Sequence, residues 1–370
     1  MAGAGEAAAK TAVPSLVHDV GDDYFDTHRH YSIASRHRVY TTMDLLLDHC
    51  CLETPQGWVL ALHRASPSNT FLWRPQDGHR IVLPPMDAAD LPTNSRCLLT
   101  HKLSDEPGAA DPCVVVVFHL ASARYWFCRV RGGTQWQHRP YTLATLNSEG
   151  TPLLAWYVGI AAVGGKIYHQ LSMHELGVLE FNPVEAEPTL TRIQVYKVRI
   201  PRGSPLFSSY LVESCGELFL VVVYFQTYFT IHTVDRVALY KMDFSKPAWR
   251  KVKHIGDRVF LLGGKRGSNF SNFGASCPAS EHRLAADRIY FFNHIFNWAN
   301  YLHVFNLTNR TEEVQCIFEG IEDVLRTPFW MLPTEVPYIS RFQRFAKWFF
   351  TNGRRLLSFH TDFVTWPKLF

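Results

Sequence analysis

The sequence lacks the segments that direct a chain into or across a membrane. Its first ten residues are rich in Ala and Gly without an apolar signal core, and the acidic residues Glu6, Asp19 and Asp22 are unlike an organellar transit peptide. The longest uncharged apolar stretch, residues 218–234, is shorter than the about 20 residues of a membrane-spanning helix. Its β-branched and aromatic residues instead predict two adjacent strands. We therefore expect a cytoplasmic or nuclear protein.

Charge of either sign is scarce. The chain has 370 residues, of which 37 are Lys or Arg and 33 are Asp or Glu, together 19%, against roughly 25% in typical soluble domains. Residues 338–370 hold six basic residues and one acidic residue, a net charge of +5, so the rest of the chain sums to −1. Because a broad nucleic-acid surface needs clustered Lys and Arg, we expect no nucleic-acid partner.

Motifs for catalysis and for cofactor binding are also missing. The sequence has no Gly-x-Ser-x-Gly elbow, no P-loop spacing and no CxxC pair. The glycines at 159, 164 and 165 and the segment 263–267 are interpreted as turns between strands, although Lys265 and Arg266 give the second turn a weak anion site. We therefore predict no catalytic residue and no cofactor.

One group of residues superficially resembles a metal site. It consists of His28, His30 and His37 with His49, Cys50 and Cys51. His28 and His30 would share one face of a strand, but no matching second pair of ligands exists, so no metal is predicted. The eight cysteines are irregularly spaced and are expected to be reduced thiols, mainly buried.

Strand-forming residues are abundant. Aromatic residues make up 14% of the chain and hydrophobic residues 47%, and the recurring local unit is a small or acidic turn residue, one variable residue and an apolar–aromatic run. This unit begins at Gly57, Gly165, Gly216, Asp257 and Asp287. Further runs of strand length cover residues 113–119, 125–130, 194–200, 237–243 and 302–307. The pattern predicts an all-β protein.

Many short strands in units of about 40–50 residues favour a β-propeller. We predict a disordered lead over residues 1–19 and a single propeller of six or seven four-stranded blades over residues 20–337. A pair of β-sandwiches is the alternative, but the sequence shows no linker between two such domains. Large rings near strand ends, at Trp73, Trp136 and Trp249, are predicted to pack between blades.

Several segments resemble the plant F-box-associated β-propeller family, long labelled a domain of unknown function, which includes the kinase-inhibiting F-box proteins of brassinosteroid signalling. In chain order, the resemblance lies in residues 71–75 with 81–85, 164–168, 210–218, 255–263, 288–292 and 329–333. The sequence departs from the family pattern at Arg288, where the family has Cys, and at Asn293-His294, where it has an acidic pair.

The resemblance implies a propeller fold and a role in protein interaction. In family members an F-box ahead of the propeller docks on a Skp1-type adaptor, while the propeller engages a target for ubiquitination. Here fewer than 25 residues precede the first propeller segment near Tyr24, which is too few to hold an F-box. We therefore do not expect binding to a Skp1-type adaptor.

From Ile339 the period of two changes to a helical period. Phe342, Phe345 and Phe349 fall on one face with Ile339, and the basic residues fall on the other face, which Trp348 interrupts. We predict a basic amphipathic helical tail over residues 338–370, with four candidate partner-binding residues: Arg341, Arg344, Lys347 and Trp348. The tail either packs on the propeller or binds a partner or a membrane surface.

These observations support three functional hypotheses. The first is a monomeric, non-enzymatic module that binds a protein target. The second is a hydrolase-like propeller enzyme acting on a small polar substrate at the channel mouth, which a channel lined by two or more carboxylates would favour. The third is a ubiquitin-ligase substrate receptor, which requires binding to a Skp1-type adaptor.

Overall fold

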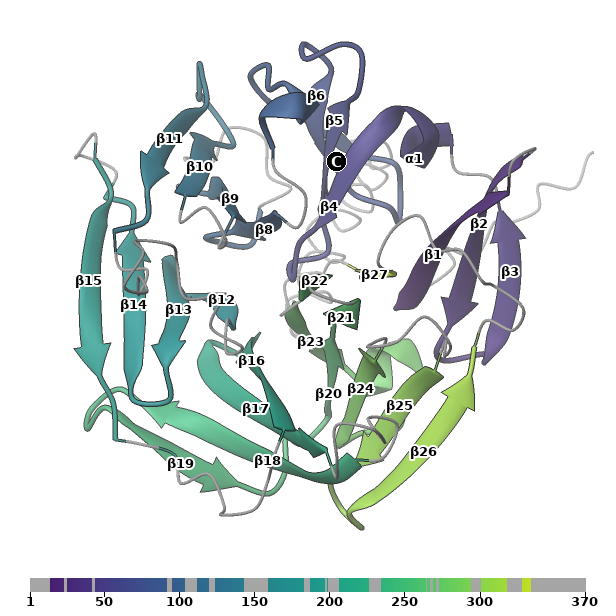
Figure 1. The fold of residues 1–370 in the computed structure, drawn as a ribbon, viewed down its shortest axis with the longest axis vertical. Helices are drawn as coiled ribbons and strands as arrows, with labels where there is room; N and C mark the ends of the chain where they lie inside the picture. The colour runs from purple at the N-terminus through teal and green to yellow at the C-terminus, as the bar shows by residue number, and fades with distance from the viewer. Residues whose placement is uncertain are drawn as a thin grey trace, which may run out of the picture. The chain divides into compact units, whose positions relative to one another are not determined.

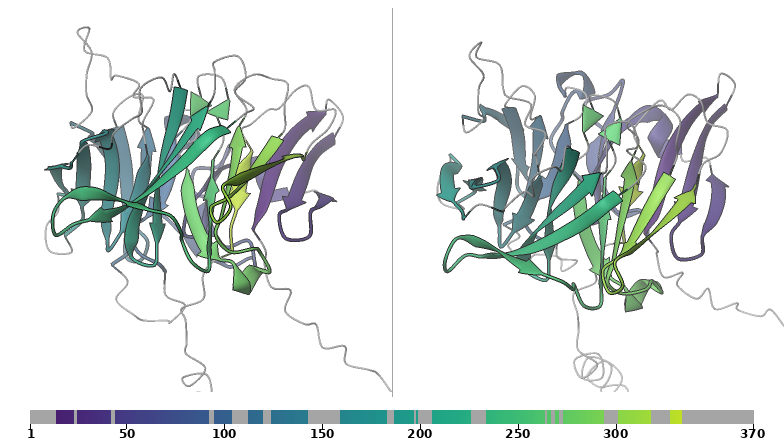
Figure 2. Two further views of the ribbon diagram at one scale, coloured as in Figure 1. Left: turned by 90° about the horizontal axis from the view of Figure 1, so that it is seen from below. Right: turned by 60° about the horizontal axis from the view of Figure 1, so that its bottom comes forward.

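The computed structural model describes residues 14–22, 25–41, 44–91, 95–103, 112–119, 124–142, 159–182, 187–196, 198, 206–225, 234–263, 265–266, 269–270, 273–293, 301–317 and 328–333. Residues 1–334 form one compact unit, in which six sheets stand around a common axis (Figure 1). Seen from the side, the strands run from one face of the ring to the other (Figure 2). The fold is therefore an all-β, six-bladed β-propeller, as predicted, with the lower of the two predicted blade counts.

Each blade is one sheet, numbered here in chain order. Blade 1 contains β27 (Phe329–Met331), β1 (Ser15–Asp22), β2 (Phe25–Ser32) and β3 (His37–Thr41). Blade 2 contains β4 (His49–Glu53), β5 (Val59–His63), β6 (Thr70–Trp73) and β7 (Arg80–Val82). Blade 3 contains β8 (Arg96–Leu99), β9 (Val114–His119), β10 (Arg124–Arg129) and β11 (Gln137–Pro140).

Blades 4 to 6 follow the same order from the inside outwards. Blade 4 contains β12 (Ile160–Val163), β13 (Lys166–Ser172), β14 (Glu175–Glu180) and β15 (Thr189–Gln194). Blade 5 contains β16 (Leu206–Ser214), β17 (Glu217–Phe225), β18 (Val234–Asp243) and β19 (Ala248–Val252). Blade 6 contains β23 (Gly274–Pro278), β20 (Arg258–Leu262), β24 (Arg288–Asn293), β25 (Tyr301–Asn306) and β26 (Thr311–Cys316).

The remaining described elements are short. They are the helix α1 (Asp44–Asp48), the 3-10 helices η1 (Ala88–Asp90) and η2 (Ser280–His282), and the hairpin of β21 (Lys265–Arg266) and β22 (Asn269–Phe270). No helix in the described part of the chain has the length and apolar character of a membrane span.

The recurring sequence unit leads into buried strands near the inside of the blades. In blades 4 and 5, Gly165 (φ +82°) and Gly216 (φ +79°) complete two-residue turns that lead into β13 and β17, because glycine adopts positive φ without steric cost. The two acidic versions of the unit open β20 and β24, which lie next to each other in parallel. Blade 6 therefore has five strands, whereas four were predicted for every blade.

The ring is closed by a strand from each end of the described chain. β27 pairs antiparallel with β1, and Leu16 lies opposite Trp330. The predicted disordered lead over residues 1–19 is therefore wrong at its C-terminal boundary, since β1 begins at Ser15. Leu16 and Val17 are buried, but two apolar residues followed by His18 and Asp19 are too short an apolar run to predict a strand.

Six apolar clusters fill the spaces between neighbouring blades. Trp73, Trp136 and Trp249 each belong to or pack against one of them, which confirms their predicted packing role. The inner strands approach closely around Leu211 of β16. A Cβ atom on Gly159 would lie 2.6 Å from the Leu211 backbone nitrogen, so this contact between blades 4 and 5 requires glycine.

Other sequence predictions have mixed outcomes. The stretch 218–234 does supply two adjacent strands, β17 and the start of β18. The described residues of the run 194–200 do not form the predicted strand: β15 ends at Gln194, and Tyr196 makes only an isolated bridge to Ala248 of blade 5. All eight cysteines are free, as expected, but only four of them are buried: Cys97, Cys113, Cys128 and Cys277. The predicted tail over residues 338–370 lies outside the described residues.

Candidate functional site

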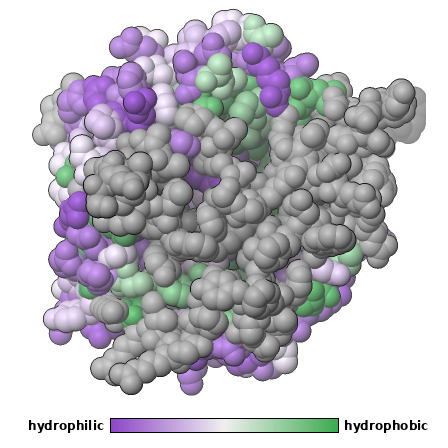
Figure 3. Space-filling model, viewed as in Figure 1, coloured by the Kyte–Doolittle hydropathy of each residue, from purple (hydrophilic) through white to green (hydrophobic). Residues whose placement is uncertain are grey.

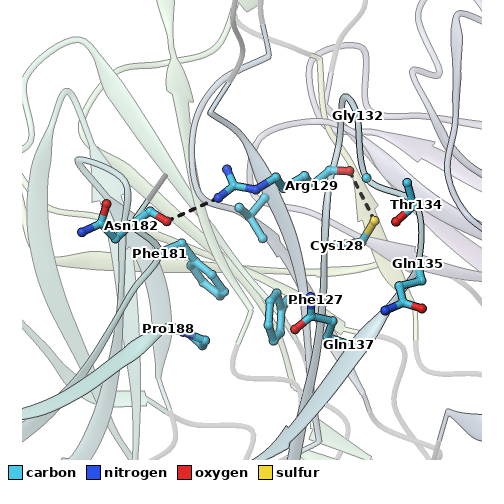
Figure 4. A pocket seen from close by; sticks show the side chains of 12 residues that line it. Phe127, Cys128, Arg129, Gly132, Thr134, Gln135, Gln137, Phe181, Asn182 and Pro188 are labelled. Atoms are coloured by element: carbon cyan, nitrogen blue, oxygen red, sulfur yellow. Dashed lines mark hydrogen bonds between the residues drawn. The ribbon is translucent and has the colours of Figure 1, made fainter. Parts of the chain in front are cut away.

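A cavity of about 230 Å³ lies between blades 3 and 4 (Figure 4). One wall is formed by β10, the loop that follows it and the start of β11. The other wall is formed by Phe181, Asn182 and Pro188, between β14 and β15. Hydrophilic residues predominate along the described rim on the β11 and β15 side of the face shown in Figure 3.

The loop between β10 and β11 owes its path to two glycines. Gly132 has a φ of +75°, which is readily adopted only by glycine. At Gly133 the loop folds back against β10, and a Cβ atom there would lie 2.7 Å from the sulfur of Cys128. The Gly-Gly pair therefore shapes the wall that carries Thr134 and Gln135.

The interior of the cavity combines aromatic surface with one cation. The rings of Phe127 and Phe181 face each other from the two blades, with their centroids 5.2 Å apart. The Arg129 side chain reaches across, and its Nη2 donates a hydrogen bond to the Asn182 carbonyl oxygen at 3.3 Å (Figure 4). This arrangement suits a ligand with an apolar part and an acceptor or negative group.

A second arginine holds the two walls together. Arg139 of β11 donates two hydrogen bonds to the Glu187 carboxylate, one from Nε to Oε2 at 2.8 Å and one from Nη2 to Oε1. The hydrogen bonding holds the pKa of Glu187 below its ordinary value. Because Glu187 is exposed and Arg139 is partly exposed, the pair positions the two walls more than it stabilises the fold.

The cavity offers binding groups and no proton-transfer group among its described lining. Its twelve lining residues include neither a carboxylate nor an imidazole. Its one thiol, Cys128, is 2% exposed and donates to the Arg129 carbonyl oxygen at 3.3 Å. Burial raises the pKa of Cys128 to about 11, so the sulfur remains a thiol at neutral pH and is a poor nucleophile.

Carboxylates are sparse and separated on the inner strands. Among the described residues of β27, β4, β8, β12, β16 and β23, only Glu53 and Glu213 are acidic, and their blades, 2 and 5, face each other across the ring (Figure 1). Burial raises the pKa of Glu53 to about 7, opposed by the charge of nearby Arg96. Glu213 accepts the Gly216 backbone N–H in a turn at 2.8 Å. These two residues do not form a carboxylate pair.

The residues that the sequence singled out fall elsewhere. Arg341, Arg344, Lys347 and Trp348 lie outside the described residues. The six His and Cys residues of the metal-like group are divided between β2 and β3 of blade 1 and β4 of blade 2, and the described part of the chain contains no group of three or more metal-ligating side chains. Lys265 and Arg266 form β21.

Sequence reasoning missed the cavity. The only local signal is the Gly132-Gly133 pair ahead of Thr134, and it is indistinguishable from an ordinary turn without knowledge of which blades adjoin. The other wall comes from a segment about 50 residues further along the chain. A site of this kind is defined by the ring topology rather than by a motif.

Comparisons with solved structures give low similarity. The chain is similar to apo AztD from Citrobacter koseri, with 8% identity over 81% of this chain and 93% of that chain and a TM-score of 0.33. It is also similar to the alpha-L-arabinanase of Cellvibrio cellulosa, with 7% identity over 72% of this chain and 90% of that chain and a TM-score of 0.28. A third similar structure is the Cps50 (Swd1) β-propeller domain of Myceliophteria thermophila, with 8% identity over 79% of this chain and 90% of that chain and a TM-score of 0.27. These similarities are too low to inform function.

The family comparison is more specific. No curated protein matches the sequence, but the model of the KIB1-4 β-propeller family matches residues 30–319. The match covers most of the chain, from the end of β2 in blade 1 to the last strand of blade 6, and it confirms the resemblance to the plant F-box-associated propellers. This protein therefore belongs to the KIB1-4 β-propeller family.

Proposed function

We propose that this protein is a non-enzymatic protein-interaction module and that the cavity between blades 3 and 4 receives side chains of its protein target. The observation that carries this proposal is the pairing of Arg129 with the facing rings of Phe127 and Phe181. Arginine and aromatic residues dominate the energetics of protein interfaces. Membership in a family of target-binding propellers supports the same role.

The size and chemistry of the cavity favour a protein target over a cofactor. Its volume of about 230 Å³ is below the roughly 300–1,000 Å³ of typical small-molecule sites, and is suited to one or two side chains. The single guanidinium and the amides of Gln135 and Gln137 provide donors for an acidic or carbonyl-bearing group.

The proposal is tested by affinity purification from native tissue, with bound proteins quantified for the wild type and two variants. Arg129→Gln combined with Phe181→Ala should reduce recovery of the specific target by about tenfold, the effect of losing roughly 1.4 kcal/mol of binding free energy. Arg124→Ala is the matched control, since Arg124 is exposed at the opposite end of β10. Equal recovery by both variants, with unchanged thermal unfolding, would contradict the proposal.

A further inference from the structure

Exposed basic residues follow the outer strand of blade 5. The segment from Phe244 to Lys253 contains four cations and no acidic residue. All four cations are exposed: Lys246, Arg250, Lys251 and Lys253. Only Arg250 has an acidic partner among the described residues, because its Nε lies 3.3 Å from Asp243 Oδ2. The segment therefore presents unneutralised positive charge.

Asp243, directly before this segment, cannot neutralise it further. Its Oδ1 accepts from the Ser245 backbone N–H at 3.1 Å, from the Ser245 hydroxyl at 2.6 Å and from the Lys246 backbone N–H at 3.3 Å, and its Oδ2 accepts from Arg250. The Ser245 hydroxyl bond, followed by those backbone and Arg250 bonds, holds the pKa of Asp243 below its ordinary value. The carboxylate thus caps the turn.

Two exposed aromatic side chains border the same segment. Tyr196 is 78% exposed and Phe244 is 42% exposed, and they are two of the four large hydrophobic side chains exposed in the described part of the chain. The Tyr196 backbone N–H donates to the Pro247 carbonyl oxygen at 3.0 Å, and Tyr196 bridges to Ala248. This backbone contact places Tyr196 at the start of β19.

The strand also has an available edge. One edge of β19 pairs with β18 from Asp243↔Ala248 to Leu239↔Val252. On its other edge, the described residues pair with it only through the Tyr196 bridge. An open edge offers backbone donors and acceptors to an added strand.

We propose that the blade-5 strip, defined as Tyr196 together with residues 244–253, is a docking surface for an acidic, extended segment of a partner protein. The partner segment adds as a strand to β19, its carboxylates pair with Lys246, Lys251 and Lys253, and its apolar residues cover Tyr196 and Phe244. Charge complementarity selects this occupant. Lysines on an edge strand repel a basic strand, disfavour a neutral strand because pairing with it would remove water from their charges, and attract an acidic strand.

Other occupants fit less well. The basic C-terminal residues of this chain, with a net charge of +5 over 338–370, would be repelled by the strip. A nucleic acid or a membrane would be drawn to a wide basic face, whereas these cations follow a single strand on a body whose net charge outside the tail is −1.

The test uses the full chain and a fluorescent peptide of about 12 residues with alternating Glu and Val, long enough to span a strand. We expect saturable binding by fluorescence anisotropy that weakens as salt is raised. Lys251→Glu with Lys253→Glu should weaken binding by at least about tenfold, and Tyr196→Ser by about threefold. The matched control is Arg64→Glu with Arg124→Glu, which changes the net charge equally on blades 2 and 3.

Specificity is measured with three further probes: the matched peptide of alternating Gln and Val, a single-stranded RNA oligonucleotide of equal charge, and vesicles of phosphatidylcholine and phosphatidylserine. The proposal is overturned by equal binding of the two peptides, by equal loss in both double variants, or by tighter strip-dependent binding of RNA or vesicles. Arg129→Gln, a substitution in the cavity between blades 3 and 4, should leave binding of the peptide to the blade-5 strip unchanged. The test of the strip is therefore independent of the test of the cavity. Thermal unfolding of each variant confirms that it is folded.

Discussion

Asp287 shows how one residue can organise the end of a blade. Its backbone has a φ of +59°, which Asp tolerates better than most residues. Its carboxylate accepts hydrogen bonds from the Ile255 backbone N–H at 2.7 Å, from His254 at 2.6 Å and from the Thr308 hydroxyl at 3.2 Å. The residue therefore ties the entry to β20 and the turn after β25 to the start of β24.

Asp287→Ala should destabilise the protein by about 2–3 kcal/mol at pH 7, because it removes these acceptors and places an alanine at positive φ. Asp287→Asn should cost about half as much, since asparagine keeps one acceptor oxygen and tolerates the same backbone conformation. Urea unfolding of both variants measures the difference. Equal losses would contradict this prediction, because they would show that the acceptor oxygen and the backbone tolerance that asparagine retains contribute nothing there.

The same residue predicts a dependence on pH. Burial alone would raise the pKa of Asp287, but the N–H of Ile255, the His254 side chain and the Thr308 hydroxyl hold it below the ordinary value. A carboxyl whose pKa is lowered on folding contributes stability above its unfolded pKa, and this contribution is lost as the pH falls through the folded pKa. The difference in unfolding free energy between wild type and Asp287→Ala should therefore shrink at acidic pH.

At the scale of elements, the strand β27, which closes the ring by pairing with β1, is short. It has three residues, and its central Trp330 is 1% exposed. The indole Nε1 donates to the Leu262 carbonyl oxygen of blade 6 at 2.8 Å, while the backbone pairs with β1. One side chain thus joins the first and last blades.

Trp330→Ala should destabilise the protein by about 3–5 kcal/mol, the cost of a large cavity in a packed core. Trp330→Phe retains most of the packing but leaves the Leu262 carbonyl without this donor, which should cost about 1–3 kcal/mol. Thermal and urea unfolding measure both. A loss no larger for alanine than for phenylalanine would mean that packing of the ring is unimportant for closure.

The sequence predicts strands well where both faces are buried. The units beginning at Gly57, Gly165 and Gly216 lead into β5, β13 and β17, whose apolar runs are long enough to identify locally. The outer strands are less evident: β15 alternates exposed and partly buried residues. β1 has only a short apolar run, Leu16 and Val17. The parallel pairing of β20 with β24 could not be predicted locally. Both strands follow the same Asp-Arg unit, and nothing in that unit shows that the two strands are neighbours in one blade.

The candidate sites were less predictable than the fold, for a topological reason. Phe127 and Phe181 meet because blades 3 and 4 adjoin, and the Tyr196 contact with β19 arises where the chain crosses from blade 4 to blade 5. Neither juxtaposition has a fixed sequence spacing. By contrast, the role of Trp73, Trp136 and Trp249 in packing could be anticipated, because a large ring at a strand end has few other places to be buried.

At the scale of the whole molecule, two truncated chains distinguish the contribution of ring closure by β27 from the contribution of the tail. A chain ending at Thr334 retains β27 and every residue of the six apolar clusters, so it should remain soluble and unfold in one cooperative transition. A chain ending at residue 327 lacks β27 and leaves one edge of β1, at Leu16 and Val17, without a partner strand. It should aggregate because an apolar edge is exposed.

Circular dichroism during heating and size-exclusion chromatography measure both outcomes. If the chain ending at Thr334 also aggregates, the Phe-rich face predicted for residues 338–370 covers apolar surface of the propeller, and closure by β27 is insufficient for a stable ring. If it stays monomeric with an unchanged unfolding temperature, the tail is not required for the fold. Its basic and aromatic residues, Arg341, Arg344, Lys347 and Trp348, are then available for a partner.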